Sequence, residues 1–146
     1  VNMLFTFNIG CMLNLKKVAN ENYKNCKYNP QVFGGLILNY AAPKCSVTLH
    51  ATGSGILTGV KSVSVAKRVL DKVSKMLTRI GFFPKPNDLT LNSVTYTGKF
   101  PFRPNLHIIK RNYGNNAYYE PELFNGLRLS IPDSKVNYLC KREITK

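Results

Sequence analysis

An internal repeat is the feature of this sequence that most restricts its fold. Residues 28–38 read YNPQVFGGLIL, and residues 119–129 read YEPELFNGLRL. Tyr, Pro, Phe, Gly and two Leu thus return in the same order, 91 positions later. A self-similarity of this kind indicates a duplicated supersecondary unit.

The repeat extends to both sides of this segment, with matches of Asn2-Met3-Leu4 to Asn92-Ser93-Val94 and of Leu49 to Leu139. These further matches lie at a spacing of 90. We therefore predict a first repeat over residues 1–88 and a second over residues 89–146. The second repeat is expected to be incomplete, without its last strands and its long helix.

The pattern within the first repeat predicts both strands and helices. Runs rich in β-branched and aromatic residues, separated by Gly and Pro, are typical of strands. These runs are residues 2–9, 32–40, 45–51 and 56–60, with turns at Pro30, at Ala41–Lys44 and at Gly53 with Gly55. Helical spacing predicts a short helix over 13–26 and a long one over 62–80, capped by Ser62 or Ser64 and followed by Gly81.

This order of elements predicts an α+β fold. Two such units can join into one curved antiparallel sheet with both long helices on its convex face. The other face of the sheet would then be uncovered. We expect this uncovered face to be apolar and to include Leu4, Phe33, Val94 and Phe124; Leu57 is a further candidate whose face the pattern leaves open.

The charge of the chain indicates a polyanionic partner. Twenty-one Lys and Arg against seven Asp and Glu give a net charge of +14. A charge carried only for solubility is usually built from mixed signs, so DNA, RNA or an acidic surface is the favoured partner. An apolar sheet face on a basic protein suits a duplex, with apolar side chains against sugars and bases and cations against phosphates.

The sequence gives little support to metal, membrane or catalytic function. Its four cysteines form no C-x-x-C pair, and His50 and His107 are far apart, so no metal site or cofactor is expected. Reduced core thiols in an intracellular compartment are the default interpretation. No run of 18 apolar residues occurs. The seven carboxylates are scattered, so we expect neither an enzyme nor a small-molecule substrate.

The repeated segments resemble the core domain of the TATA-box-binding protein (TBP) family. The motifs that carry the resemblance are N-x-x-x-T-x-x-x-G-C-x-L-x-L-K from Asn2, Y-N-P-x-x-F from Tyr28, L-T-G-x-K from Leu57, K-F-P-x-R from Lys99 and Y-E-P-E-L-F-x-G-L from Tyr119. The resemblance covers nearly the whole chain and implies a saddle of two pseudo-symmetric repeats. It also implies a divergent member of the family, which a large DNA virus could encode.

The resemblance implies a DNA-binding set in the minor groove. Asn2 and Asn92 match the asparagines that hydrogen bond to groove acceptors, and Leu4 and Val94 match the apolar residues beside them. Thr58 matches a groove-facing threonine. Phe33 and Phe124 each match one phenylalanine of an intercalating pair, and His50 stands at the position of the second phenylalanine in the first repeat.

The resemblance also implies a protein-binding set. Glu120, Glu122 and Leu123 match positions that dock an initiation factor of the IIB type, which together with the RNA polymerase machinery is the expected partner. The basic residues of the predicted long helix would meet regulators; they are Lys67, Arg68, Lys72, Lys75 and Arg79. The implied location is the nucleus, or a cytoplasmic virus factory if a cytoplasmic DNA virus encodes the chain.

Several positions depart from the family pattern. The second wedge phenylalanines are expected at His50 and at Cys140, and a groove-facing arginine is replaced by Asn39 in one repeat and Ser130 in the other. Ile144-Thr145 is a candidate start for the missing strand. These departures keep an alternative function open, a scaffold in a transcription complex that has lost most of its TATA binding. An enzyme with an accessory saddle domain is the other alternative, for which no catalytic residues are found.

Overall fold

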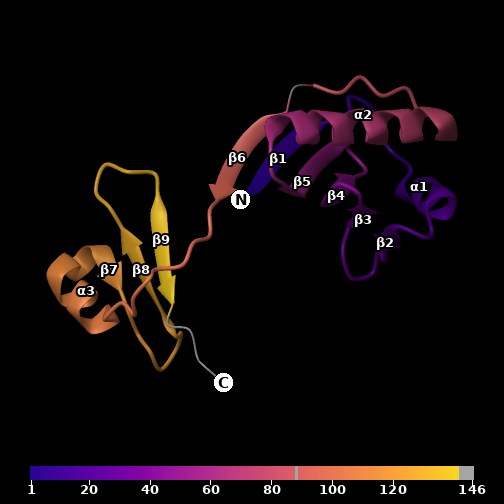
Figure 1. The fold of residues 1–146 in the computed structure, drawn as a ribbon. Coiled ribbons are helices and arrows are strands. Elements are labelled where there is room, and N and C mark those ends of the chain that lie inside the picture. Colours follow the sequence, from indigo (N-terminus) through magenta and orange to yellow (C-terminus); the bar gives the residue numbers. More distant parts are fainter. Residues whose placement is uncertain (88, 142–146) are drawn as a thin grey trace. The chain divides into compact units, whose positions relative to one another are not determined.

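The computed structural model describes residues 1–87 and 89–141 and divides the chain into two compact units, Val1–Thr97 and Gly98–Lys146. The first unit contains β1 (Asn2–Asn8), α1 (Leu15–Glu21), β2 (Cys26–Tyr28), β3 (Gly35–Ala41), β4 (Lys44–His50), β5 (Ser54–Val60), α2 (Val63–Ile80) and β6 (Thr90–Thr95). Its strands form one antiparallel sheet in the order β2-β3-β4-β5-β1-β6, and α2 lies across one face of that sheet (Figure 1).

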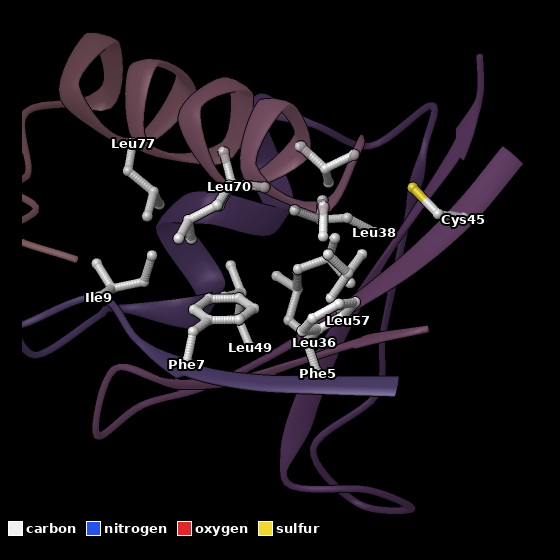
Figure 2. Packing of buried hydrophobic residues seen from close by; sticks show 14 of the residues in the cluster. Phe5, Phe7, Ile9, Leu36, Leu38, Cys45, Leu49, Leu57, Leu70 and Leu77 are labelled. Carbon is white, nitrogen blue, oxygen red and sulfur yellow. The ribbon is translucent and has the colours of Figure 1, made fainter. Parts of the chain in front are cut away.

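Helix α2 has the boundaries that its sequence predicts. Ser62 is the N-cap and accepts a hydrogen bond from the amide of Val65, and Gly81 ends the helix with a φ of 104°. The apolar stripe along the helix is buried from Ala66 to Leu77, while Ile80 at its end is half-buried. Figure 2 shows Leu70 and Leu77 reaching from α2 toward the aromatic and aliphatic side chains of the sheet.

The side chains of each strand alternate between the core and the opposite face. Phe5 and Phe7 of β1 are buried under α2, and Leu4 and Thr6 between them point the other way. The same alternation buries Leu57 of β5, which is 1% exposed. Leu57 therefore belongs to the core, which decides the face that the sequence pattern left open.

Local hydrogen bonds explain where the elements differ from the sequence-based ranges. The predicted strand 32–40 begins only at Gly35, because the amides of Val32 and Phe33 both donate to the carbonyl oxygen of Asn29 and close a turn. Helix α1 is shorter than predicted because Asn14 caps it and β2 already begins at Cys26. Gly53 forms the expected turn with a φ of 87°, but Gly55 lies within β5.

The second unit has a smaller core. It contains α3 (Leu106–Tyr113), the 3-10 turn η1 (Gly114–Asn116), β7 (Ala117–Tyr118), β8 (Gly126–Ser130) and β9 (Asn137–Lys141), with the strands paired in the order β7-β8-β9. The buried hydrophobic residues of its described part are Leu106, Ala117 and Leu127. The described part of this unit contains no counterpart of β5 or α2, and Ile144-Thr145 lies outside the described residues.

The structure repeats the same local features at the spacing found in the sequence. Asn14 caps α1 and Asn105 caps α3, each through its side-chain oxygen. The turn at Asn29 also returns, because the amides of Leu123 and Phe124 both donate to the carbonyl oxygen of Glu120. Strand β6, which begins the second repeat in sequence, pairs with β1 of the first unit. The repeat boundaries at 88 and 89 remain a prediction, distinct from the boundary between compact units.

Candidate nucleic-acid interface

The face of the six-stranded sheet opposite α2, here called the open face, is formed by the residues that alternate with the core. It includes Asn2, Leu4, Thr6, Lys27, Ile37, Asn39, Ser46, Thr48, His50, Ile56 and Thr58. This face is less apolar than the sequence suggested, since hydroxyl and amide groups outnumber aliphatic ones. Serine and threonine are as compatible with half-exposed strand positions as apolar residues are. The alternating pattern therefore predicted the strands but not the polarity of this face.

Asn2 lies beside a β-bulge that fixes its side-chain amide. Met3 pairs with Val60 and Leu4 with Thr58, which leaves Gly59 as the extra residue with a φ of 90°. The backbone amide of Gly59 donates to Oδ1 of Asn2 at 2.9 Å. Because the oxygen is engaged in this way, the NH₂ group of Asn2 is the part of the amide that can donate to a ligand.

Asn92 reaches a similar arrangement from β6. Leu4 pairs with Ser93 and Phe5 with Leu91, so Asn92 is the extra residue of a second bulge. The hydroxyl of Thr6, on the open face, donates to Oδ1 of Asn92 at 2.9 Å. The oxygen of this amide is again engaged by the protein. Both asparagines thus belong to one unit, and in each the NH₂ group is the part of the amide that can donate to a ligand.

The apolar residues beside the asparagines do not share one face. Leu4 lies on the open face with its cross-strand neighbours Thr58 and Ser93. Val94 pairs with Met3, which packs against the core, and directly opposed residues of an antiparallel pair point to the same face. Val94 therefore lies on the helix-covered side, away from Leu4. The cause is the bulge at Asn92, which shifts the alternation by one residue.

Phe33 lies over the open face, in the turn that precedes β3. A side-chain carbon at Gly35 would lie 2.5 Å from the ring of Phe33, so the ring occupies the space that the glycine leaves. The ring of His50, which pairs with Gly35, is 5.8 Å from that of Phe33 in an edge-to-face contact. Phe33 keeps 45% of its surface exposed although it is aromatic.

Phe124 has the same position in the second unit. A side-chain carbon at Gly126 would lie 2.6 Å from its ring, and the ammonium group of Lys141 lies 5.1 Å from the ring centroid. Gly126 pairs with Lys141 as Gly35 pairs with His50. The expectation that Cys140 is the counterpart of His50 was therefore wrong. Cys140 pairs with the buried Leu127 and packs into the small core.

The residues expected to bind a protein partner, two acidic and one apolar, lie on the turn before Phe124. Glu120, Glu122 and Leu123 are all exposed, Leu123 by 77%. A hydrogen bond to the Glu120 carboxylate raises the pKa of Tyr118 above its ordinary value.

The basic residues of α2 are exposed on the side of the helix away from the core. They are Lys67, Arg68, Lys72, Lys75 and Arg79. Four of them, without Lys67, line a shallow depression together with Tyr40 and Asp71. The ammonium group of Lys72 lies 4.7 Å from the ring centroid of Tyr40. Burial is the main cause that raises the pKa of Tyr40.

The described residues offer little for other chemistry. Among them no group of three His, Cys, Asp or Glu side chains could hold a metal ion, and no helix is long and apolar enough to cross a membrane. Cys11, Cys26, Cys45 and Cys140 are free thiols. Burial raises the pKa of Cys26 and of Cys45 above the ordinary value, which disfavours the reactive thiolate.

Sequence reasoning missed several residues of this interface. Thr6 and Ser93 were not distinguished from other strand residues. Lys141 was missed because a spacing of 90 from His50 leads to Cys140, whereas the spacing in the structure is 91. The motif pair at Tyr28 and Tyr119 already carried the correct spacing. Extending it past Leu129 would have identified Lys141.

Comparisons with known proteins agree on one family. Residues 1–80 match the model described as transcription factor TFIID (or TATA-binding protein, TBP). The TATA-box-binding protein of Saccharomyces cerevisiae is 33% identical over 137 residues, which cover 92% of this chain and 56% of the relative. TATA-box-binding protein 2 of Entamoeba histolytica is 29% identical over 95% of this chain and 65% of the relative. The chain thus spans less than two thirds of these relatives.

The structural comparison extends across both units. Methanococcus jannaschii TBP superposes with a TM-score of 0.81 and 29% sequence identity, covering 97% of this chain and 80% of that one. This likeness confirms the predicted fold class, an α+β fold of the TBP kind.

Proposed function

Because the chain belongs to the TATA-binding protein family, we propose that it is a transcription initiation factor that binds double-stranded DNA in the minor groove and bends it. The observation that carries this proposal is the pair of amides at Asn2 and Asn92, whose oxygens are engaged by the protein and whose NH₂ groups remain as donors. The family is one of transcription factors rather than enzymes, in agreement with the absence of catalytic motifs in the sequence.

The chemistry of the groove fits these donors. The minor groove of A·T pairs presents acceptors only, adenine N3 and thymine O2, whereas a G·C pair adds the guanine amino donor. An NH₂ group can donate to adenine N3 or thymine O2, whereas the guanine amino group is itself a donor and cannot accept from it. The net charge of +14 supplies the attraction to phosphates that brings the protein to a duplex. The charge favours any duplex, and the amide donors favour one that is rich in A·T pairs.

Replacing Asn2 or Asn92 with Ala should weaken binding to an A·T-rich duplex by about 1–3 kcal/mol, since each change removes donors to base edges. The measurement is fluorescence anisotropy with a labelled duplex at fixed salt. Asn20→Ala, at an exposed position of α1, is the matched control, because it removes an amide that is not part of the open face. Unchanged affinity in both single variants would remove the asparagines from the interface.

A salt titration separates the proposed function from a protein scaffold that has lost DNA reading. Binding in the groove predicts an affinity that falls with salt and exceeds that for a G·C-rich duplex at every salt concentration. A scaffold predicts weak attraction with no difference between the two duplexes. The scaffold remains the second candidate because His50 and Lys141 stand where each repeat would carry a second wedge phenylalanine.

We further propose that the turn of Glu120, Glu122 and Leu123 docks a basic factor of the IIB type and so recruits RNA polymerase. The turn is acidic and apolar on an otherwise basic protein, which favours a partner of opposite charge. The exposed cations of α2 form a separate candidate surface for regulators.

Charge reversal by Glu122→Lys should weaken capture of a IIB-type factor at least about tenfold, because a like charge then meets the basic partner. Duplex affinity should not fall, since the change adds a cation. Surface-immobilised protein with the purified factor in solution gives both values. Glu21→Lys, at the exposed end of α1, is the matched control. Equal weakening by both variants would contradict a specific role of the turn.

The nucleus is the location that fits this function. The relatives named above include eukaryotic TATA-box-binding proteins, and none of these supports a virus factory or a viral origin. A direct comparison of the tagged protein with a nuclear marker would establish the location.

A further inference from the structure

A cross-strand pair of Asn and Ser occupies the open face of the first unit beyond Asn2 and Asn92. Asn39 of β3 pairs directly with Ser46 of β4, and the serine hydroxyl donates to Oδ1 of Asn39 at 2.7 Å. Leu38 next to Asn39 is buried, as are Cys45 and Val47 on both sides of Ser46. Both members of the pair therefore face away from the core.

The second unit contains the same pair with its members exchanged. Ser130 of β8 pairs with Asn137 of β9, and the hydroxyl of Ser130 donates to Oδ1 of Asn137 at 2.8 Å. Each residue lies 91 positions after its counterpart, at the spacing of the repeat, but the amide has moved from one strand of the pair to the other. The exchange keeps one amide and one hydroxyl at the same place in both units.

In each pair the hydrogen bond determines which end of the amide is presented. The oxygen accepts from serine, so the NH₂ group is the part of the amide that can donate to a ligand, as at Asn2 and Asn92. Asn39 and Asn137 are both exposed. A hydrogen bond between exposed side chains contributes little to stability because water competes for both groups. Stability alone is therefore a poor explanation for a pair that returns with exchanged members.

We propose that Asn39 and Asn137 are two further groove-reading amides, one in each unit, which donate to adenine N3 or thymine O2 of A·T base pairs. Ser46 and Ser130 are positioning residues that hold each amide with its donor end toward the DNA. This inference rests on the proposed function, because it assigns more of the same groove to named residues. The expected ligand is an A·T-rich duplex, which the charge of +14 favours over a neutral or cationic partner.

Single substitutions in the protein and in the duplex test this assignment together. Asn39→Ala and Asn137→Ala should each weaken binding to an A·T tract about three- to tenfold, the value of one exchanged hydrogen bond. The slope of affinity against salt should not change, because no charge is removed. A set of duplexes with one A·T pair replaced by G·C at successive positions then shows where each amide reads. Wild-type protein should bind more weakly when G·C stands at the position that Asn39 reads, and Asn39→Ala should bind equally well with A·T or G·C there. Asn137→Ala should show the same indifference at a different position.

The controls separate a reading role from a structural one. Asn20→Ala should leave both affinity and the position profile unchanged, and all variants should keep the wild-type melting temperature. Ser46→Ala, which retains the amide but frees its orientation, should give a smaller loss at the same position as Asn39→Ala. A loss spread evenly over all positions, or no loss, would overturn the inference while wild-type A·T preference upheld the proposed function. No A·T preference in wild-type protein would overturn the proposed function itself.

Discussion

Replacing Phe5 with Ala is expected to lower the free energy of unfolding of the first unit by about 3–5 kcal/mol, the range for removal of a buried aromatic ring. Phe5 is 1% exposed and lies in the core beneath α2 (Figure 2). A loss of this size is a large part of the stability of an ordinary domain. Urea denaturation followed by circular dichroism measures it.

Leu4→Ala provides the matched control from the adjacent position. Leu4 lies on the open face, so we expect its truncation to cost about 1 kcal/mol or less in stability. The same change should weaken duplex binding, because it removes apolar contact with the groove. Similar destabilisation by the two variants would contradict the assignment of the two sheet faces.

Replacing both Phe33 and Phe124 with Ala is expected to remove most of the bend in a bound duplex. Unstacking a base step costs a few kcal/mol, which an inserted aromatic wedge offsets. The two rings are held over glycines and remain 45% exposed, so they are available for insertion. Fluorescence energy transfer between the two ends of a labelled duplex, at saturating protein, measures the bend.

The opposite change tests the same mechanism. His50 and Lys141 stand beside the two phenylalanines, and neither gives a second fully apolar wedge. The combined His50→Phe and Lys141→Phe variant should deepen the bend and sharpen the preference for sites with a flexible T-A step, because more deformation is then demanded. A wild-type bend as deep as that of this variant would mean that other side chains supply the missing wedges.

The elements with strong local signals could be predicted from the sequence. Helix α2 was predictable to within one residue, because its apolar stripe, Ser62 and Gly81 all act within the helix itself. The α+β fold and the two repeats were also predictable, since the Y-x-P-x-x-F segments fix both a turn and its spacing.

Features that depend on pairing between distant strands were not predictable. The bulges at Gly59 and Asn92 are set by the register of three strands, and they decide that Val94 lies on the helix-covered side. Leu57 was equally ambiguous, because an isolated strand does not specify which of its faces is covered. The partnership of Asn39 with Ser46 likewise required the observed register of β3 and β4.

The roles of the interface residues remain predictions, because they depend on a ligand. Asn2, Leu4, Phe33, His50 and Thr58 share the exposed side of one unit, and Phe124 repeats the setting of Phe33 in the other.

Duplexes that contain inosine·cytosine pairs test most directly whether the protein reads the minor groove. Inosine lacks the amino group of guanine, so an I·C pair resembles A·T in the minor groove and G·C in the major groove. Affinity is measured for three duplexes of equal length, with A·T, I·C or G·C pairs in the central tract, at the same salt concentration. Minor-groove reading predicts that the I·C duplex binds nearly as tightly as the A·T duplex and much more tightly than the G·C duplex. Binding of the I·C duplex at the level of the G·C duplex would contradict it.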